Sequence, residues 1–196
     1  MYQGTVCLSA DASRGTALGW GPGTRTLELS LNSLRNQVVA CGDGGMDYEV
    51  TVVDVPARRT AVVRAVTTWQ EFPTLWRELS GEVWACLRAN GIERGCRNVM
   101  LYLDSAPSVE VGVLLDQPCH MTGRVVASTL PEGTAATTIH RGSFAELGAA
   151  HDAVVSWCAD HGHRLTGTRW EVYGPHDDDP AQQWTEVSWL VAPASG

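Results

Sequence analysis

The amino-acid sequence predicts an α+β domain that is built twice from one strand-helix-strand-strand module, with an antiparallel sheet, two long helices and pseudo-two-fold symmetry. The first observation is an internal repeat: residues 52–115 and 125–191 carry the same patterns in the same order, with a period of roughly 70 residues. The second is that strand-like and helical runs come in separate blocks, without the regular alternation that parallel sheets require. Two like halves predict a central ligand groove along their symmetry axis. The aligned residues are Pro56 with Pro131, Thr60 with Thr134, Phe72 with Phe144, Leu75 with Leu147, Tyr102 with Tyr173, and Glu110 with Glu186.

Each half begins and ends with a pair of strands. In the first half, the β-branched runs at 50–55 and 60–66 are separated by the segment that starts at Pro56, and this spacing indicates a hairpin. Alternating apolar residues at 99–104 and 109–115 predict the second pair. The second half repeats these runs.

A long helix is expected between the strand pairs of each half, over about 72–90 and about 144–161, because apolar residues recur there at three- and four-residue spacing. Pro73 suits a first helical turn, since its fixed φ is already helical. Gly91 favours the end of the first helix because glycine adopts the left-handed conformation readily. Ser143 is expected to cap the start of the second helix.

The N-terminal segment differs in composition from the rest. Residues 1–45 are rich in glycine, with one short periodic stretch at 27–39, and we expect a poorly ordered or mis-called extension. Met46 directly precedes the first clean strand and would serve as an original start. A small tail that packs on the domain through its leucines is the alternative. The domain itself is expected over 46–193.

Composition excludes several classes of protein. A formal charge of −8 argues against direct binding of nucleic acid, which requires clustered cations, and the sequence has no apolar run long enough to span a membrane. The six cysteines are scattered, without the spacing of a zinc site or the density of a disulfide framework. No signal peptide, phosphate-binding loop or dinucleotide fingerprint is visible. We therefore expect a cytoplasmic protein without a metal or cofactor. Surface or capping roles are expected for the histidines, namely His120, His140, His151, His161, His163 and His176.

Strand alternation assigns the side chains of the sheet to two faces. Val99, Leu101 and Leu103 are expected to face the helices together with Trp170 and Val172, and the opposite face then needs another role. A carboxylate in an apolar groove either binds a cation or becomes a usable acid or base. Aromatic walls hold flat or cationic guests by stacking and cation–π contact. The expected ligand-binding set on that second face is Glu171, Tyr102, Tyr173, Glu186, Glu110 and Met100, without any arginine, and Trp69 and Trp184 are expected to line its walls.

The sequence also resembles the GyrI-like family, whose fold is shared by the drug-binding domains of bacterial multidrug-sensing regulators of the MerR and AraC types. The resemblance covers about 46–193. It is carried by Arg-Val-Val-Ala-Ser-Thr-Leu-Pro-Glu-Gly-Thr-Ala at 124–135, by His140-Arg-Gly-Ser-Phe, and by the closing Trp170-Glu-Val-Tyr173 and Trp184-Thr-Glu-Val. It implies a groove between the two modules that binds planar, often cationic compounds against aromatic walls and a buried glutamate. Glu171 and Tyr173 match the family's Glu-x-Tyr motif.

Two functions follow as expectations. Residues 1–45 contain no helix-turn-helix pattern, so a direct role in transcription is not expected. The favoured function is a stand-alone binding protein, a monomer or weak homodimer, that senses or sequesters toxic hydrophobic, aromatic or cationic small molecules. The alternative follows from the resemblance, because some stand-alone members hydrolyse cyclopropane-bearing genotoxic natural products. In that case Glu171 would activate water, and Tyr173 would protonate or orient the substrate.

Overall fold

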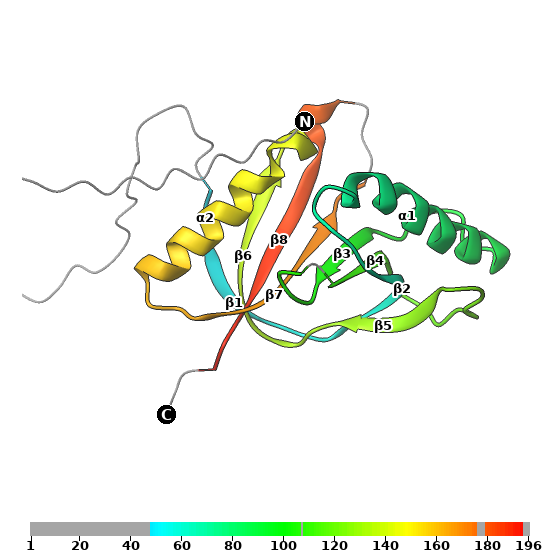
Figure 1. The fold of residues 1–196 in the computed structure, drawn as a ribbon, viewed down its shortest axis with the longest axis horizontal. Coiled ribbons are helices and arrows are strands. Elements are labelled where there is room, and N and C mark those ends of the chain that lie inside the picture. The colour runs from blue at the N-terminus through cyan, green and yellow to red at the C-terminus, as the bar shows by residue number, and fades with distance from the viewer. Residues whose placement is uncertain (1–47, 107, 176–178, 194–196) are drawn as a thin grey trace, which may run out of the picture. The chain divides into compact units, whose positions relative to one another are not determined.

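The computed structural model describes residues 48–106, 108–175 and 179–193, so the expectations for the segment 1–45 lie outside the described residues. The described chain is an α+β domain with one eight-stranded antiparallel sheet and two α-helices (Figure 1), which confirms the predicted class. The elements are β1 (Thr51–Val55), β2 (Arg58–Val66), α1 (Phe72–Ala89), β3 (Asn98–Tyr102), β4 (Ser108–Leu114), β5 (Val126–Leu130), β6 (Gly133–Arg141), the 3₁₀ turn η1 (Phe144–Glu146), α2 (Leu147–Asp160), β7 (Leu165–Tyr173), the 3₁₀ turn η2 (Pro180–Gln182) and β8 (Trp184–Val191).

The strand order is β1-β6-β8-β7-β3-β4-β2-β5. Helix α1 packs against β2 and β4, and α2 packs against β6 and β8. The two central strands, β7 and β3, therefore lie between the helices (Figure 1). The two halves of this order, β1-β6-β8-β7 and β5-β2-β4-β3, correspond strand by strand as a duplication would require. The duplication itself stays a prediction, which superposition of the halves would test.

The predicted hairpin between β1 and β2 is wrong. Strand β1 pairs with β6, whereas β2 pairs with β4 and β5. Only Pro56 and Ala57 connect β1 to β2, and a two-residue hairpin of the favoured type needs a positive φ at its first central residue. The proline ring holds φ at about −65°, so the chain cannot reverse there and crosses to the other half of the sheet. Pro131 has the same effect between β5 and β6.

The helices begin and end close to the predicted residues. Helix α1 spans Phe72–Ala89, and Gly91 follows it with a φ of 76°. Helix α2 begins at Leu147, three residues later than predicted, because a 3₁₀ turn comes first, and the Ser143 hydroxyl accepts a hydrogen bond of 3.2 Å from the Ala145 N–H at the start of that turn. None of the described helices is both long and apolar enough to cross a membrane.

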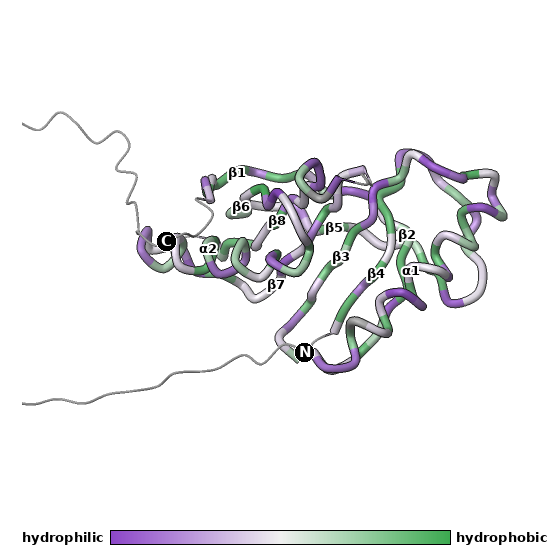
Figure 2. Tube along the Cα trace, turned by 90° about the horizontal axis from the view of Figure 1, so that it is seen from above, coloured by the Kyte–Doolittle hydropathy of each residue, from purple (hydrophilic) through white to green (hydrophobic). Residues whose placement is uncertain are grey.

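The assignment of the central strands to the two faces is corrected by the structure. Met100 packs with α1, and its partner across the β3–β7 pair is Glu171. Val99, Leu101 and Trp170 instead form an apolar cluster on the second face. Both faces of these strands are buried, so alternation separates the two sets but does not say which set faces a helix. Figure 2 views the sheet from above, with hydrophobic residues along β2 and β4 beside α1.

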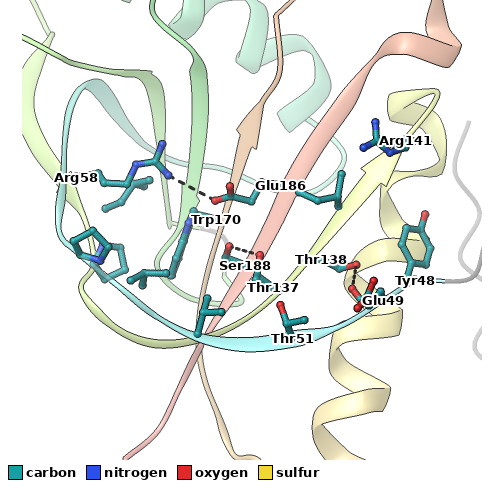
Figure 3. Close-up of a pocket in the computed structure, with 16 residues that line it drawn as sticks. Tyr48, Glu49, Thr51, Arg58, Thr137, Thr138, Arg141, Trp170, Glu186 and Ser188 are labelled. Atoms are coloured by element: carbon teal, nitrogen blue, oxygen red, sulfur yellow. Dashed lines mark hydrogen bonds and ion pairs between the residues drawn. The ribbon is translucent and has the colours of Figure 1, made fainter. Parts of the chain in front are cut away.

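The second face carries a cavity of about 850 Å³ (Figure 3). Strand β1 and the connections at Pro56 and Pro131 border it, and Trp170 and Ser188 contribute to its lining. Glu186 also lines the cavity, and its carboxylate forms an ion pair with the Arg58 guanidinium at 3.6 Å.

Candidate functional site

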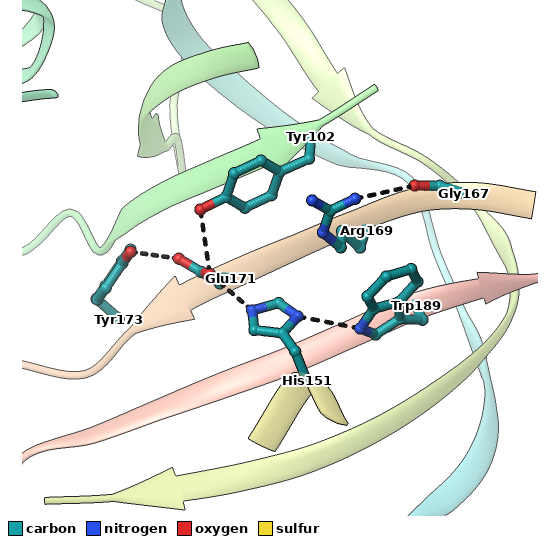
Figure 4. A network of polar contacts seen from close by, with 7 residues as sticks. All are labelled: Tyr102, His151, Gly167, Arg169, Glu171, Tyr173 and Trp189. Atoms are coloured by element: carbon teal, nitrogen blue, oxygen red, sulfur yellow. Dashed lines mark hydrogen bonds and ion pairs between the residues drawn. The ribbon is translucent and has the colours of Figure 1, made fainter. Parts of the chain in front are cut away.

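Glu171 is the centre of a polar cluster on the helix side of the sheet (Figure 4). Only 3% of this residue is exposed, although it lies on the central strand β7. Its carboxylate accepts a hydrogen bond from the Tyr102 hydroxyl on β3 at 3.2 Å, from the Tyr173 hydroxyl on its own strand, and from His151 Nε2 on α2 at 2.8 Å. Three elements thus converge on one buried carboxylate.

Strand register and helix periodicity produce this convergence. Tyr102 and Arg169 face each other across the β3–β7 pair, so Tyr102 lies diagonally opposite Glu171. Tyr173 follows Glu171 by two residues and therefore shares its face. His151 lies one turn after the buried Leu147 on α2, so the stripe that docks the helix also brings the imidazole to the carboxylate.

The hydrogen-bond donors fix the protonation of the network. The Trp189 indole Nε1–H can only donate, and it donates to His151 Nδ1 at 3.0 Å. His151 is therefore the neutral tautomer with its proton on Nε2, and that proton points to Glu171. Every partner of the carboxylate is then an uncharged donor, which leaves its negative charge uncompensated by a hydrogen-bonded cation.

The two tyrosines remain phenols at neutral pH. Burial raises the pKa of Tyr102 well above its ordinary value, the charge of Glu171 raises this pKa further, and Arg169 opposes the effect. Burial likewise raises the pKa of Tyr173 well above its ordinary value, and the neighbouring Glu171 and Tyr102 add to the shift. Both hydroxyls therefore keep their protons and donate hydrogen bonds to Glu171.

Aromatic rings from the strands, from α2 and from the segments that precede the two helices surround the carboxylate. On the side of α1, Trp69 lies 5.7 Å from Tyr102 between ring centroids, and on the side of α2, His151 lies 5.8 Å from Trp189. Phe144 packs edge-on against Tyr173 at 5.5 Å. Trp69 is 51% exposed, so this aromatic cluster reaches solvent. An acidic group beside a cluster of aromatic rings can hold a flat or cationic molecule.

Half of the predicted ligand-binding set comes together here. Glu171, Tyr102, Tyr173 and Trp69 all belong to the cluster. Met100 is opposite Glu171 in register, but it is buried in the core under α1.

The other predicted residues lie elsewhere, because one set of strand positions was assigned to the wrong face. Glu110 and Glu186 are on the second face, where each is paired with an arginine, Arg64 at 2.7 Å and Arg58 at 3.6 Å. The expected face with three carboxylates and no arginine does not exist in the described residues. Trp184 lies two residues before Glu186 on β8, so it points to the same second face.

Sequence reasoning missed three members of the site, His151, Arg169 and Trp189. His151 was expected on the surface or at a cap, yet it is partly buried and joins Glu171 to Trp189. The periodicity of α2 contains the clue, since a histidine on an apolar stripe needs polar partners in the sheet below. His140 is also buried, between the Tyr48 hydroxyl and the Ser143 carbonyl.

The charges and cavities of the two faces point to different sites. The second face holds the cavity of about 850 Å³, but the partly exposed Glu186 in its lining is already paired with Arg58. The Glu171 cluster gathers converging polar groups and aromatic rings, which is the pattern of a ligand site. Over the described ranges, no group of three or more His, Cys, Asp and Glu side chains is placed to hold a metal ion.

A buried acidic cluster with aromatic rings between the two helices of an antiparallel α+β domain is an arrangement typical of a small-molecule-binding domain. The family model of the GyrI-like small molecule binding domain matches residues 48–191. The chain therefore belongs to the GyrI-like family, as its sequence motifs predicted.

Solved structures share the fold. The C-terminal domain of EcmrR is 23% identical with a TM-score of 0.61, and the match covers 75% of this chain and 99% of that domain. SAV2435, solved bound to tetraphenylphosphonium, is 13% identical with a TM-score of 0.53 over 76% of this chain and 95% of its own. An uncharacterised conserved protein from Listeria innocua is 14% identical with a TM-score of 0.52 over 74% of this chain and 92% of its own. No curated protein sequence matches the chain.

Proposed function

We propose that this domain binds hydrophobic aromatic cations at the Glu171 site and thereby senses or sequesters toxic compounds of this kind. Small-molecule binding is the property of the family to which the chain belongs. The cationic and aromatic character of the ligand is inferred from the charge and the aromatic rings of the site.

The observation that carries the proposal is the state of the Glu171 carboxylate. It is buried, its three hydrogen-bond donors are neutral, and no arginine within the described residues forms an ion pair with it. An ionised group in such surroundings gains strongly from a positive charge. At about 5 Å and an effective dielectric constant of about 20, that attraction is about 3 kcal/mol. Each aromatic contact with a cation adds about 0.5–2 kcal/mol.

Tetraphenylphosphonium has the required chemistry, a permanent positive charge inside an apolar aromatic shell. It is the compound bound in the structure of SAV2435, and it serves here as the probe. Triphenylphosphine oxide is a neutral aromatic compound of related shape and serves as the comparison ligand.

The test is a titration of Trp fluorescence with both compounds, for the wild type and for Glu171→Gln. The amide keeps the shape of the side chain but removes its charge, so we expect the affinity for tetraphenylphosphonium to fall about tenfold or more. The affinity for the neutral oxide should change far less. Equal losses for the two compounds, or none, would contradict the proposal.

Glu186→Gln is the matched control. It removes the same charge from the same sheet, but from the second face, where the carboxylate is paired with Arg58. We expect it to leave the affinity for tetraphenylphosphonium within about twofold of wild type, since the loss of a distant charge is largely screened. A larger loss in Glu186→Gln than in Glu171→Gln would move the ligand to the second face.

Hydrolysis of a cyclopropane-bearing compound is the alternative function. A general base needs a free lone pair to take a proton, and the hydrogen bonds from Tyr102, Tyr173 and His151 leave Glu171 about one of its roughly four. Binding is therefore favoured. Turnover of such a genotoxin by the wild type, abolished in Glu171→Gln, would establish the hydrolase instead.

A further inference from the structure

The aromatic cluster around Glu171 already contains a cation, the guanidinium of Arg169. Its central carbon lies 4.6 Å from the ring centroid of Tyr102, 4.8 Å from that of Trp189 and 5.5 Å from that of Trp69. All three distances are within the range of about 6 Å that defines a cation–π contact. We call these three rings the aromatic cage.

Strand pairing places the arginine in the cage. Arg169 faces Tyr102 across the β3–β7 pair and Trp189 across the β7–β8 pair, so two of the rings flank it on neighbouring strands. Trp69 closes the cage from the segment before α1 and is half exposed. The guanidinium is thus enclosed by rings on three sides and lies two residues from the buried carboxylate.

Few polar contacts hold the guanidinium there. Its one hydrogen bond within the described residues is donated to the Gly167 carbonyl over 3.4 Å, which is long (Figure 4). It forms no ion pair with any carboxylate in the described parts of the chain. Burial lowers the pKa of Arg169, and the negative charges of Glu171 and Asp104 oppose this. The side chain is therefore held chiefly by the rings, and its long flexible stem would let it leave for solvent.

We propose that Arg169 is a built-in competitor for cationic ligands: its guanidinium fills the cation position of the aromatic cage in the empty protein, and a ligand cation binds by displacing it. This inference rests on the proposed function, because the displacing ligand is the aromatic cation of that site. It adds a specificity-determining residue. Small cations without apolar surface gain too little to displace the guanidinium, whereas large aromatic cations offset the exchange by burying their rings.

The first test compares the wild type with Arg169→Met, whose side chain is unbranched, of similar length and uncharged. Removing the competitor should strengthen the binding of tetraphenylphosphonium at least tenfold in isothermal titration. Tetramethylammonium should bind measurably to the variant and not to the wild type. The affinity for neutral triphenylphosphine oxide should change by less than the affinity for either cation.

Arg164→Met is the matched control. Arg164 is exposed and directly precedes β7, so its removal changes the net charge equally without touching the cage. It should leave both cation affinities unchanged. If Arg164→Met strengthens binding as much as Arg169→Met does, the effect is one of net charge, and the proposal is overturned. It is also overturned if Arg169→Met binds tetraphenylphosphonium no more tightly than wild type.

A second test needs no aromatic ligand. Arg169→Ala leaves the cage without its cation, and free ethylguanidinium at millimolar concentration should then raise the melting temperature of this variant but not that of the wild type. Ethylurea, which is neutral and of the same shape, should raise neither. Stabilisation by ethylguanidinium without any binding of tetraphenylphosphonium would support a cation cage while the proposed function fails. The opposite result is also informative. If all variants bind tetraphenylphosphonium equally and ethylguanidinium does not stabilise Arg169→Ala, the proposed function stands and the role of Arg169 is overturned.

Discussion

Replacing His151 with phenylalanine should destabilise the domain strongly, because two hydrogen bonds of a buried network are lost at once. Glu171 loses its 2.8 Å donor while its side chain stays 4% exposed, and the Trp189 N–H loses its acceptor at 3.0 Å. An unsatisfied buried partner costs about 1–3 kcal/mol. Glu171 keeps its donors Tyr102 and Tyr173, so its own loss is about 1 kcal/mol and the sum is about 2–4 kcal/mol. For a chain of this size, that corresponds to a fall in melting temperature of roughly 5–15 °C. The phenyl ring keeps the edge-on packing against Trp189, so little of the loss comes from a cavity.

A double-mutant cycle with Glu171→Leu, followed by urea denaturation, isolates the contribution of the pair. Once the buried charge is gone, His151→Phe should cost much less, and the coupling energy should be about 1–3 kcal/mol. His161→Phe is the control, because His161 is exposed at the end of the same helix and donates nothing to the sheet. Additive losses in the cycle, or equal losses for the two histidines, would refute the network described for the site.

Two further predictions concern the sheet and the tyrosines. Gly112→Ala should destabilise the domain by about 3 kcal/mol or more in urea denaturation, because a Cβ there would lie 1.9 Å from a backbone carbonyl oxygen of β2. Gly148→Ala is the control: a Cβ there meets nothing within 4 Å, so this change should stabilise α2 by up to about 1 kcal/mol. Stability should also fall as the pH rises past the ordinary tyrosine pKa, because the unfolded chain then loses protons that Tyr102 and Tyr173 keep in the folded state, by up to about 1.4 kcal/mol per pH unit for each. Replacing both tyrosines with phenylalanine should flatten this alkaline slope, and an unchanged slope would mean that other groups cause it.

The sequence contains enough information for the elements and for much of the site. The periodicities that define α1 and α2 depend on local spacing, and the strands follow from β-branched runs. Helices and strands can therefore be predicted without knowledge of the tertiary structure. Glu171 and Tyr173 are two residues apart on one strand, so they had to share a face whichever face it was. Tyr102 was predicted to join them because the repeat aligns it with Tyr173 across the pseudo-two-fold axis.

The sequence does not show which face of a strand meets a helix, or which distant strands pair. Val99 and Met100 are both buried, so the apolar pattern of β3 did not reveal which side meets the helix. Pro56 was taken as part of a hairpin, although its fixed φ excludes the tight turn and sends β1 to the other half of the sheet. The pairing of Glu186 with Arg58 depends on that crossing and could not be foreseen from local pattern.

The most direct test of the binding site is a crystal structure of the protein with tetraphenylphosphonium. The account predicts the phosphonium between the helices, within about 6 Å of the rings of Tyr102 and Trp189, where aromatic contact with a cation is strongest. It also predicts that the Arg169 guanidinium has left the cage and that Glu171 faces the ligand. A phosphonium in the cavity on the second face, against Trp170, with Arg169 still in the cage, would contradict it.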